Sequence, residues 1–98
     1  MSVRVERFIS TLKQSLADIL INDINDPRLK SVIVKDIQIS SDLKKAHVVI
    51  GSTADQIDEL LVKLNNAKGF FKKNLAKKMY LKYVPDLSFV GDDDNKIK

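Results

Sequence analysis

The chain contains no cysteine among its 98 residues. This absence excludes a disulfide framework and leaves no thiolate for catalysis or metal coordination, and it suits a reducing compartment. Long apolar runs are also missing: none approaches the roughly 18 to 20 residues that a membrane-spanning helix needs. Arg4, Glu6 and Arg7 follow closely after Met1, so the start lacks the apolar segment of a secretory signal. We therefore expect a cytoplasmic protein with no membrane partner.

Groups that carry catalysis or bind metal ions are scarce as well. His47 is the only histidine, and no cysteine or acidic cluster accompanies it. We therefore do not expect metal binding or acid–base catalysis at this residue. The adjacent aspartates at 92–94 lack the ligand spacing of a calcium-binding loop. We expect no enzymatic activity, no cofactor, no metal ion and no small-molecule substrate.

Acidic residues are absent from one long stretch, Leu60 to Pro85, which carries seven lysines. The other ten Lys and Arg residues are outnumbered by thirteen Asp and Glu residues, so the positive charge is local although the net charge is only +4. A helix with several lysines is usually just a solvated face. Neither solubility nor ion pairing requires segregation this complete, so the pattern favours a partner rich in phosphate.

The first half of the chain predicts a helix followed by two strands. Apolar residues from Val5 to Leu20 recur at three- and four-residue spacings, as in an amphipathic helix. This helix should end near residues 22–25, because Pro27 disfavours helical geometry in the preceding residue. Val32 to Ser40 and Lys44 to Gly51 are rich in β-branched residues and are interpreted as strands.

Finer features of these elements are also predicted. The apolar positions of the first strand change parity near Lys35 and Asp36, which indicates a bulge. Thr53 and Gln56 fit a capping box at the start of the next helix. The small residues of Ala67-Lys68-Gly69 then interrupt the helical pattern, which indicates two helices that meet at a bend.

The last helix and strand complete the predicted order. Phe71, Leu75 and Met79 share one stripe of the final helix, with lysines on the opposite side. Residues 80–84 and 87–90 are interpreted as a last strand region that Pro85 interrupts. The order helix, strand, strand, helix, helix, strand predicts an α+β domain at residues 1–90, with a three-stranded sheet and helices on one face. Residues 91–98 are expected to form a solvated tail.

This is also the element order of a type II KH domain, an RNA-binding module. A KH domain clamps single-stranded nucleotides with a Gly-x-x-Gly loop between its paired helices. The three glycines of this chain do not form that motif, and Ala67-Lys68-Gly69 stands in its place. We therefore expect a KH-like fold without the usual nucleotide clamp.

Four motifs along the chain resemble one family. They are Asn25-Asp26-Pro27-Arg28-Leu29, Ser41-Asp42-Leu43, Ala67-x-Gly69-Phe70 and Val84-Pro85-Asp86-Leu87-Ser88-Phe89. Together, over roughly residues 5–89, they are similar to ribosome-binding factor A. The resemblance implies a bacterial, cytoplasmic, non-enzymatic assembly factor that binds the small (30S) ribosomal subunit and its 16S rRNA. It also implies a role in late maturation and rRNA processing and in growth in the cold. In that family an Ala-x-Gly kink replaces the nucleotide-clamping loop.

We predict an RNA-facing patch of basic residues and a structural kink at Ala67 and Gly69. The patch is predicted to have no compensating acid, and the protein is expected to act as a monomer. Lys82 stands where the family often has an arginine, and lysine lacks the planar fork that grips phosphate. The predicted patch comprises Lys68, Lys72, Lys73, Lys77, Lys78, Lys82 and Arg28.

Several alternatives remain open at this point. Gly69 either adopts a backbone geometry that a side chain resists or lets two helices approach closely. Arg28 either contacts RNA or has a structural role, at helix-end carbonyls or beside Asp26. Phe70 either stacks on bases or packs internally, whereas Phe71 is expected in the core. The alternative function is a protein-interaction module whose lysine-rich face binds an acidic protein partner.

Overall fold

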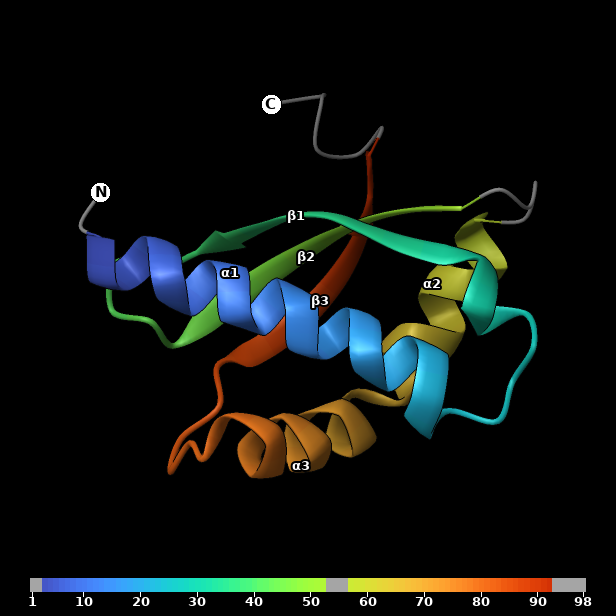
Figure 1. Cartoon of the computed structure of the whole chain (residues 1–98). Coiled ribbons are helices and arrows are strands. Elements are labelled where there is room, and N and C mark those ends of the chain that lie inside the picture. The colour runs from blue at the N-terminus through green and yellow to red at the C-terminus, as the bar shows by residue number, and fades with distance from the viewer. Residues whose placement is uncertain (1–2, 53–56, 93–98) are drawn as a thin grey trace.

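The computed structural model describes residues 3–52 and 57–92. Its elements are, in order, helix α1 (Val3–Asp18), the π-helical turn η1 (Ile19–Asp23), the 3-10 turn η2 (Leu29–Ser31), strands β1 (Val32–Ile39) and β2 (Lys45–Ser52), helices α2 (Ile57–Asn66) and α3 (Lys68–Met79), and strand β3 (Asp86–Gly91). The predicted order of elements is confirmed (Figure 1). The predicted capping box at residues 53–56 lies outside the described residues.

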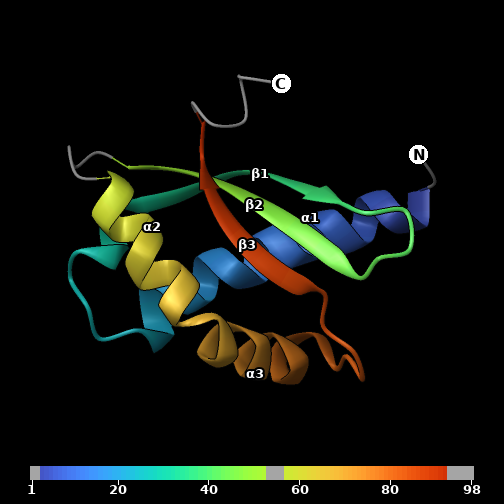
Figure 2. The same ribbon diagram turned by 180° about the vertical axis from the view of Figure 1, so that it is seen from behind.

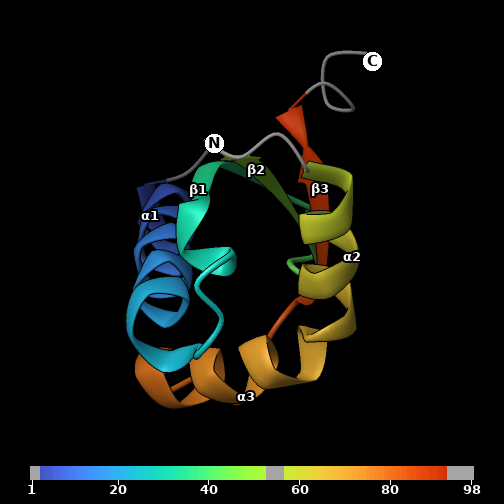
Figure 3. The same ribbon diagram turned by 90° about the vertical axis from the view of Figure 1, so that its right-hand side faces the viewer.

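The three strands form one sheet in the order β1-β2-β3. Strand β1 pairs with β2 in antiparallel orientation, and β2 pairs with β3 in parallel. Parallel neighbours need a long crossover connection, and α2 and α3 supply it (Figure 2). Helix α1 lies beside β1, α2 lies beside β3, and α3 crosses between them on the same side of the sheet (Figure 3). The predicted α+β architecture, with the helices on one face, is confirmed.

The core lies between this face of the sheet and the helices. Helix α1 contributes Leu12 and Leu16, and the π-helical turn that extends it contributes Ile19 and Leu20, all at most 2% exposed. The helix then ends before Ile24, which has an extended backbone. This is where the sequence predicted the end, because the chain must leave helical geometry ahead of Pro27.

The predicted bulge in β1 is also confirmed. Val34 pairs with Ile50 and Asp36 pairs with Val49, so Lys35 is the extra residue in the ladder. The insertion moves the buried positions from Val34 to Ile37, because side chains alternate between the two faces of a strand and one extra residue reverses the alternation.

The prediction of strand structure at residues 80–84 is wrong. Tyr80 ends α3 in a left-handed conformation (φ 54°, ψ 40°), and the chain then runs as a loop until β3 begins at Asp86. Pro85 has no amide hydrogen to donate to a sheet ladder. The first sheet bond at this end comes from the Asp86 amide, which donates to the Lys44 carbonyl at 2.8 Å.

Strand β3 extends to Gly91, which is buried. This is one residue beyond the predicted boundary at residue 90, and the remainder of the predicted tail falls mostly on residues 93–98, outside the described ones. No helix in the described part of the chain is long and apolar enough to cross a membrane.

Candidate nucleic-acid interface

The outward face of α3 carries two of the predicted lysines. Phe71 and Leu75 are fully buried on the inner side of this helix, and Lys73 and Lys77 are exposed on the other side. Their four-residue spacing places them one above the other on one face. Neither lysine forms an ion pair with any residue that the structure describes. Their ammonium groups are therefore available to a partner. We call Gly69, Lys73 and Lys77, which follow this face, the outer ridge.

The lysines that flank the outer ridge are engaged in ion pairs. On the β3 side, the Lys72 Nζ lies 3.0 Å from Asp86 Oδ1. On the α1 side, the Lys78 Nζ lies 2.6 Å from Asp18 Oδ2 and 3.2 Å from Asp23 Oδ2. The prediction that the patch has no compensating acid is therefore wrong for these two lysines, because the acids come from other elements.

These pairs affect the ionisation of their members. The hydrogen bond from Lys72 lowers the pKa of Asp86, and the nearby charges of Lys72, Lys45 and Lys68 lower it further. The hydrogen bond from Lys78 lowers the pKa of Asp18, and the same contact raises the pKa of Lys78. Asp18, Asp86 and Lys78 therefore keep their charges at neutral pH. Because exposed ion pairs contribute little to stability, Lys72 and Lys78 remain able to exchange partners.

Arg28 does not join the other predicted residues. Its guanidinium donates to Glu59 Oε2 at 2.7 Å, in the first turn of α2. Its backbone amide donates to Asp26 Oδ1 at 3.0 Å. Arg28 therefore lies at the end of α2 that is remote from α3, and these two contacts are structural.

A basic basin of about 420 Å³ lies where α3 meets the sheet. Lys68 and Lys72 reach it from α3, and Lys45 and His47 reach it from the exposed positions of β2. Among the described residues that line it, Asp86 is the only acid. The basin can therefore attract a phosphate group, and the Ser88 side chain adds a hydroxyl that can donate a hydrogen bond. The full lining is Lys45, His47, Lys68, Lys72, Asp86, Leu87 and Ser88.

Sequence reasoning missed Lys45 and His47 as part of this surface. Their alternation with buried residues does predict that they point away from the core. Their closeness to α3, however, follows from the pairing of β2 with β3, in which Lys45 faces Asp86 and His47 faces Ser88. Local sequence carries no signal for that pairing.

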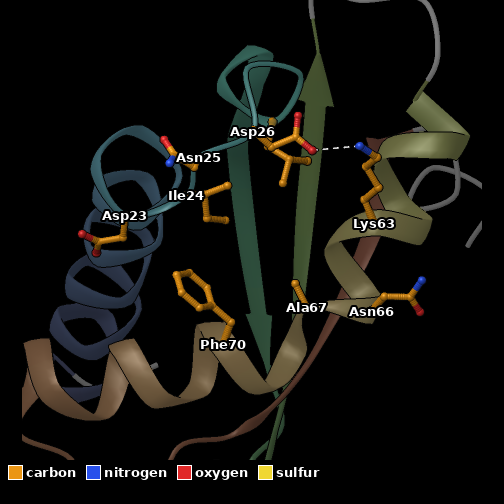
Figure 4. Close-up of a pocket in the computed structure, with 9 residues that line it drawn as sticks. Asp23, Ile24, Asn25, Asp26, Lys63, Asn66, Ala67 and Phe70 are labelled. Atoms are coloured by element: carbon orange, nitrogen blue, oxygen red, sulfur yellow. Dashed lines mark hydrogen bonds and ion pairs between the residues drawn. The ribbon is translucent and has the colours of Figure 1, made fainter.

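The bend between the helices borders a second cavity, of about 570 Å³ (Figure 4). Ala67 and Phe70 line it from the junction, and the segment from Asp23 to Asp26 lines it from the opposite side. The Lys63 Nζ donates to Asp26 Oδ2 at 2.8 Å, and this hydrogen bond, with the amide of Arg28, lowers the pKa of Asp26. Two carboxylates at this cavity make it a poorer site for phosphate than the basic basin.

Ala67 marks the bend itself. Its backbone (φ −98°, ψ 16°) leaves helical geometry between Asn66 and Lys68. Its amide donates to the carbonyls of both Lys63 and Leu64 at 3.1 Å, and its carbonyl accepts from the Phe71 amide. The small side chain fits a position where two helices diverge.

Gly69 does not have the steric role that was predicted for it. Its φ is not positive, and a Cβ built at this position would meet nothing within 4 Å. Neither an unusual backbone geometry nor close helix packing requires glycine here. The residue lies in the first turn of α3 on the outer ridge, so its backbone is open to solvent.

We expect Gly69→Ala to raise the free energy of unfolding by about 0.5–1 kcal/mol, because alanine restricts the unfolded chain and favours a helix. Gly69→Val should raise the free energy of unfolding by less than Gly69→Ala does, because a β-branched side chain loses rotamer freedom in a helix. Urea unfolding followed by circular dichroism measures both. Destabilisation by Gly69→Ala would reveal a constraint on the backbone that this geometry does not contain.

The described residues hold no group of three or more His, Cys, Asp or Glu side chains arranged to bind a metal ion. The outer ridge and the basic basin are cationic, and they suit recognition of a negatively charged partner.

Comparison with known proteins places this geometry in a family. A sequence model described as Ribosome-binding factor A matches residues 4–97. The chain belongs to the ribosome-binding factor A family. Ribosome-binding factor A of Staphylococcus carnosus is 34% identical over 92 residues, which cover 92% of this chain and 80% of the relative. The Thermodesulfovibrio yellowstonii protein is 35% identical over 91 residues, with 92% and 77% covered.

Solved structures of ribosome-binding factor A share the fold. The crystal structure of the Thermus thermophilus protein has a TM-score of 0.77 at 24% identity, covering 88% of this chain and 93% of that one. A homology model of the Thermus thermophilus factor, fitted into a cryo-electron microscopy map of its complex with the 30S subunit, has a TM-score of 0.73 at 24% identity. It covers 84% of this chain and 88% of the other. The predicted family and fold class are confirmed.

Proposed function

We propose that this protein is a non-enzymatic assembly factor that binds the small ribosomal subunit through its 16S rRNA, with the outer ridge of α3 and the basic basin facing the phosphates. Lys73 and Lys77 carry the proposal, because they are exposed, aligned and unpaired among the described residues. The family membership and the 30S complex of the Thermus thermophilus protein support it.

The proposed role includes late maturation of the subunit, assistance to rRNA processing and growth in the cold. The protein would act in the cytoplasm as a monomer, through a KH-like fold that lacks the Gly-x-x-Gly clamp. Without that clamp, lysine contacts to phosphates supply affinity, and the rigid shape of the domain fixes the register on folded rRNA. Some members of the predicted patch form no ion pair within residues 3–52 and 57–92. They are Lys68, Lys73, Lys77 and Lys82.

A salt titration tests this proposal. Each phosphate neutralised by a lysine releases counterions and contributes about 0.7 to 0.9 to the slope of log association constant against log salt. Four unpaired lysines therefore predict a slope of roughly −3 to −4 with purified small subunits. Lys77→Ala should make the slope shallower by somewhat less than one unit. Lys13→Ala is the control, because Lys13 lines a different cavity between α1 and β1.

Two results would contradict the proposal. Tight binding with a slope near zero would remove the lysines from the mechanism. Binding to an acidic protein but not to an rRNA fragment alone would favour the protein-interaction module.

A further inference from the structure

The loop between α3 and β3 exposes both tyrosines of the chain. Tyr80 is 93% exposed and Tyr83 is 80% exposed. Burial of an aromatic ring contributes strongly to folding and to binding. Scattered apolar residues on a surface are normal, but here two large rings stand in solvent three residues apart. Two exposed rings this close in sequence indicate an external partner for them.

The backbone is strained at Tyr80, in this loop, and at Leu43, in the turn between β1 and β2. Tyr80 has φ 54° and Leu43 has φ 61°, and they are the non-glycine residues with positive φ in the described part of the chain. Glycine or asparagine is the usual choice where a helix ends in this conformation, because other side chains cost energy there. A tyrosine at this position gains nothing from the core, since its side chain is in solvent. Strain of this kind is often found at functional sites.

A groove of about 660 Å³ lies beside Tyr83. Most of its lining is apolar, so it offers walls against which a flat ring can lie. Its two carboxylates are already engaged: Asp42 accepts from the Ser40 hydroxyl at 2.6 Å, and Asp86 pairs with Lys72 at 3.0 Å. The lining is Phe8, Asp42, Leu43, Lys44, Leu81, Tyr83, Val84, Pro85 and Asp86. We call this the tyrosine groove.

One cation lies beside the Tyr83 ring, and another precedes Tyr80 in the sequence. The Lys82 Nζ lies 5.8 Å from the centre of the Tyr83 ring, and Lys77 precedes Tyr80 by three residues, so this loop continues the outer ridge of α3. Residues 77–85 include no acid. Aromatic rings interleaved with cations are the arrangement that proteins use for single-stranded nucleic acid, in which bases stack on rings and lysines hold the phosphates.

We propose that Tyr80 and Tyr83 form a stacking platform for unpaired bases of RNA, with Lys77 and Lys82 on the adjoining phosphates. This proposal rests on the proposed function and specifies the kind of RNA that the loop contacts. Bases within an A-form helix are already stacked on one another and present no free face. The platform therefore prefers a single-stranded segment or an unpaired end over a duplex.

The composition of the chain provides a direct readout. Tyr80 and Tyr83 are its two tyrosines, and it contains no tryptophan, so tyrosine fluorescence arises from these rings. Stacking of an unstructured oligouridylate of about ten nucleotides, within the usual range of site sizes, should quench this emission in a saturable way. A duplex RNA of equal length should quench it less at equal occupancy. Tyr80→Phe and Tyr83→Phe each leave one emitting ring, so each position can be followed separately.

Substitutions at Tyr80 separate stacking from folding. Tyr80→Phe keeps the ring and should retain the affinity for oligouridylate within about twofold. Tyr80→Ala should lower it on the order of 5- to 150-fold, the usual range for loss of one stacked base. Tyr80→Gly should lower affinity similarly but raise the thermal midpoint, because glycine accepts the left-handed conformation. Weaker binding by a more stable protein cannot be attributed to unfolding.

Three results would overturn the platform. They are unchanged tyrosine emission at saturating oligouridylate, wild-type affinity in Tyr80→Gly, or a loss in Tyr80→Phe equal to that in Tyr80→Ala. If the tyrosine variants weaken small-subunit binding while oligouridylate causes no quenching, the rings contact a ribosomal protein and the platform is wrong. The salt slope with small subunits is a separate measurement. The proposed function is therefore judged by that slope, whatever the outcome for the platform.

Discussion

Replacement of both Lys73 and Lys77 by glutamate should weaken association with purified small ribosomal subunits by about 100-fold or more. The double substitution removes two phosphate contacts and places two negative charges against the phosphates, and like charges across an interface cost several kcal/mol. Co-sedimentation at fixed salt measures the loss. The free energy of unfolding should change by less than about 0.5 kcal/mol, because both side chains are exposed and make no ion pair among the described residues.

Lys13→Glu combined with Lys30→Glu is the matched control. It changes the net charge by the same amount, but both residues line the cavity between α1 and β1, away from the outer ridge. This variant should bind nearly as well as the wild type. An equal loss in both double variants would show that overall charge controls binding, and wild-type binding by the Lys73 and Lys77 variant would remove the outer ridge from the interface.

The arrangement of elements was predictable because its signals are local. The apolar spacing of α1, the position of Pro27 and the change of parity near Lys35 each reflect a constraint that acts within a few residues. The error at residues 80–84 has a local origin as well. Tyrosine and valine favour strands, but this preference is weaker than the requirement to end α3 and to reach the sheet after Pro85.

The electrostatics of the site was only partly predictable. The absence of acids from residues 60–85 correctly indicated a cationic α3, but Asp18 reaches Lys78 from a position sixty residues away in sequence. Such a contact depends on the packing of α1 against α3. The basic basin likewise exists only because β2 pairs with β3. The division of the lysines into paired and unpaired ones therefore required the three-dimensional arrangement.

The exposed tyrosines were missed for a related reason. In a strand, Tyr80 and Tyr83 would point to opposite faces and one would be expected to be buried. In a loop, both rings are exposed. For Gly69 the prediction assumed that glycine answers an internal constraint, whereas the structure shows open space around it. For Gly69 the sequence identified a special position but not the direction in which it faces.

Phe71→Ala should have the largest effect on stability, a loss of about 3–5 kcal/mol. Phe71 is fully buried, and its ring centre lies 5.0 Å from that of Phe89 in β3 and 6.0 Å from that of Phe70. Its removal would leave a cavity where α3 meets the sheet. Since a domain of this size is stable by about 5–15 kcal/mol, the loss should lower the thermal midpoint by more than about 10 °C.

Phe70→Ala is the comparison, because it makes the same chemical change at the neighbouring residue. Phe70 is 40% exposed and lines the junction cavity, so its ring loses less contact with the protein interior, and the cost should be about 1 kcal/mol. Urea unfolding of both variants gives the two free energies directly. Equal destabilisation would mean that the two rings share the core, and it would contradict the orientation of α3 that places Phe71 inward and Lys73 and Lys77 outward. A large difference would support that orientation, and with it the surface on which the proposed RNA contact depends.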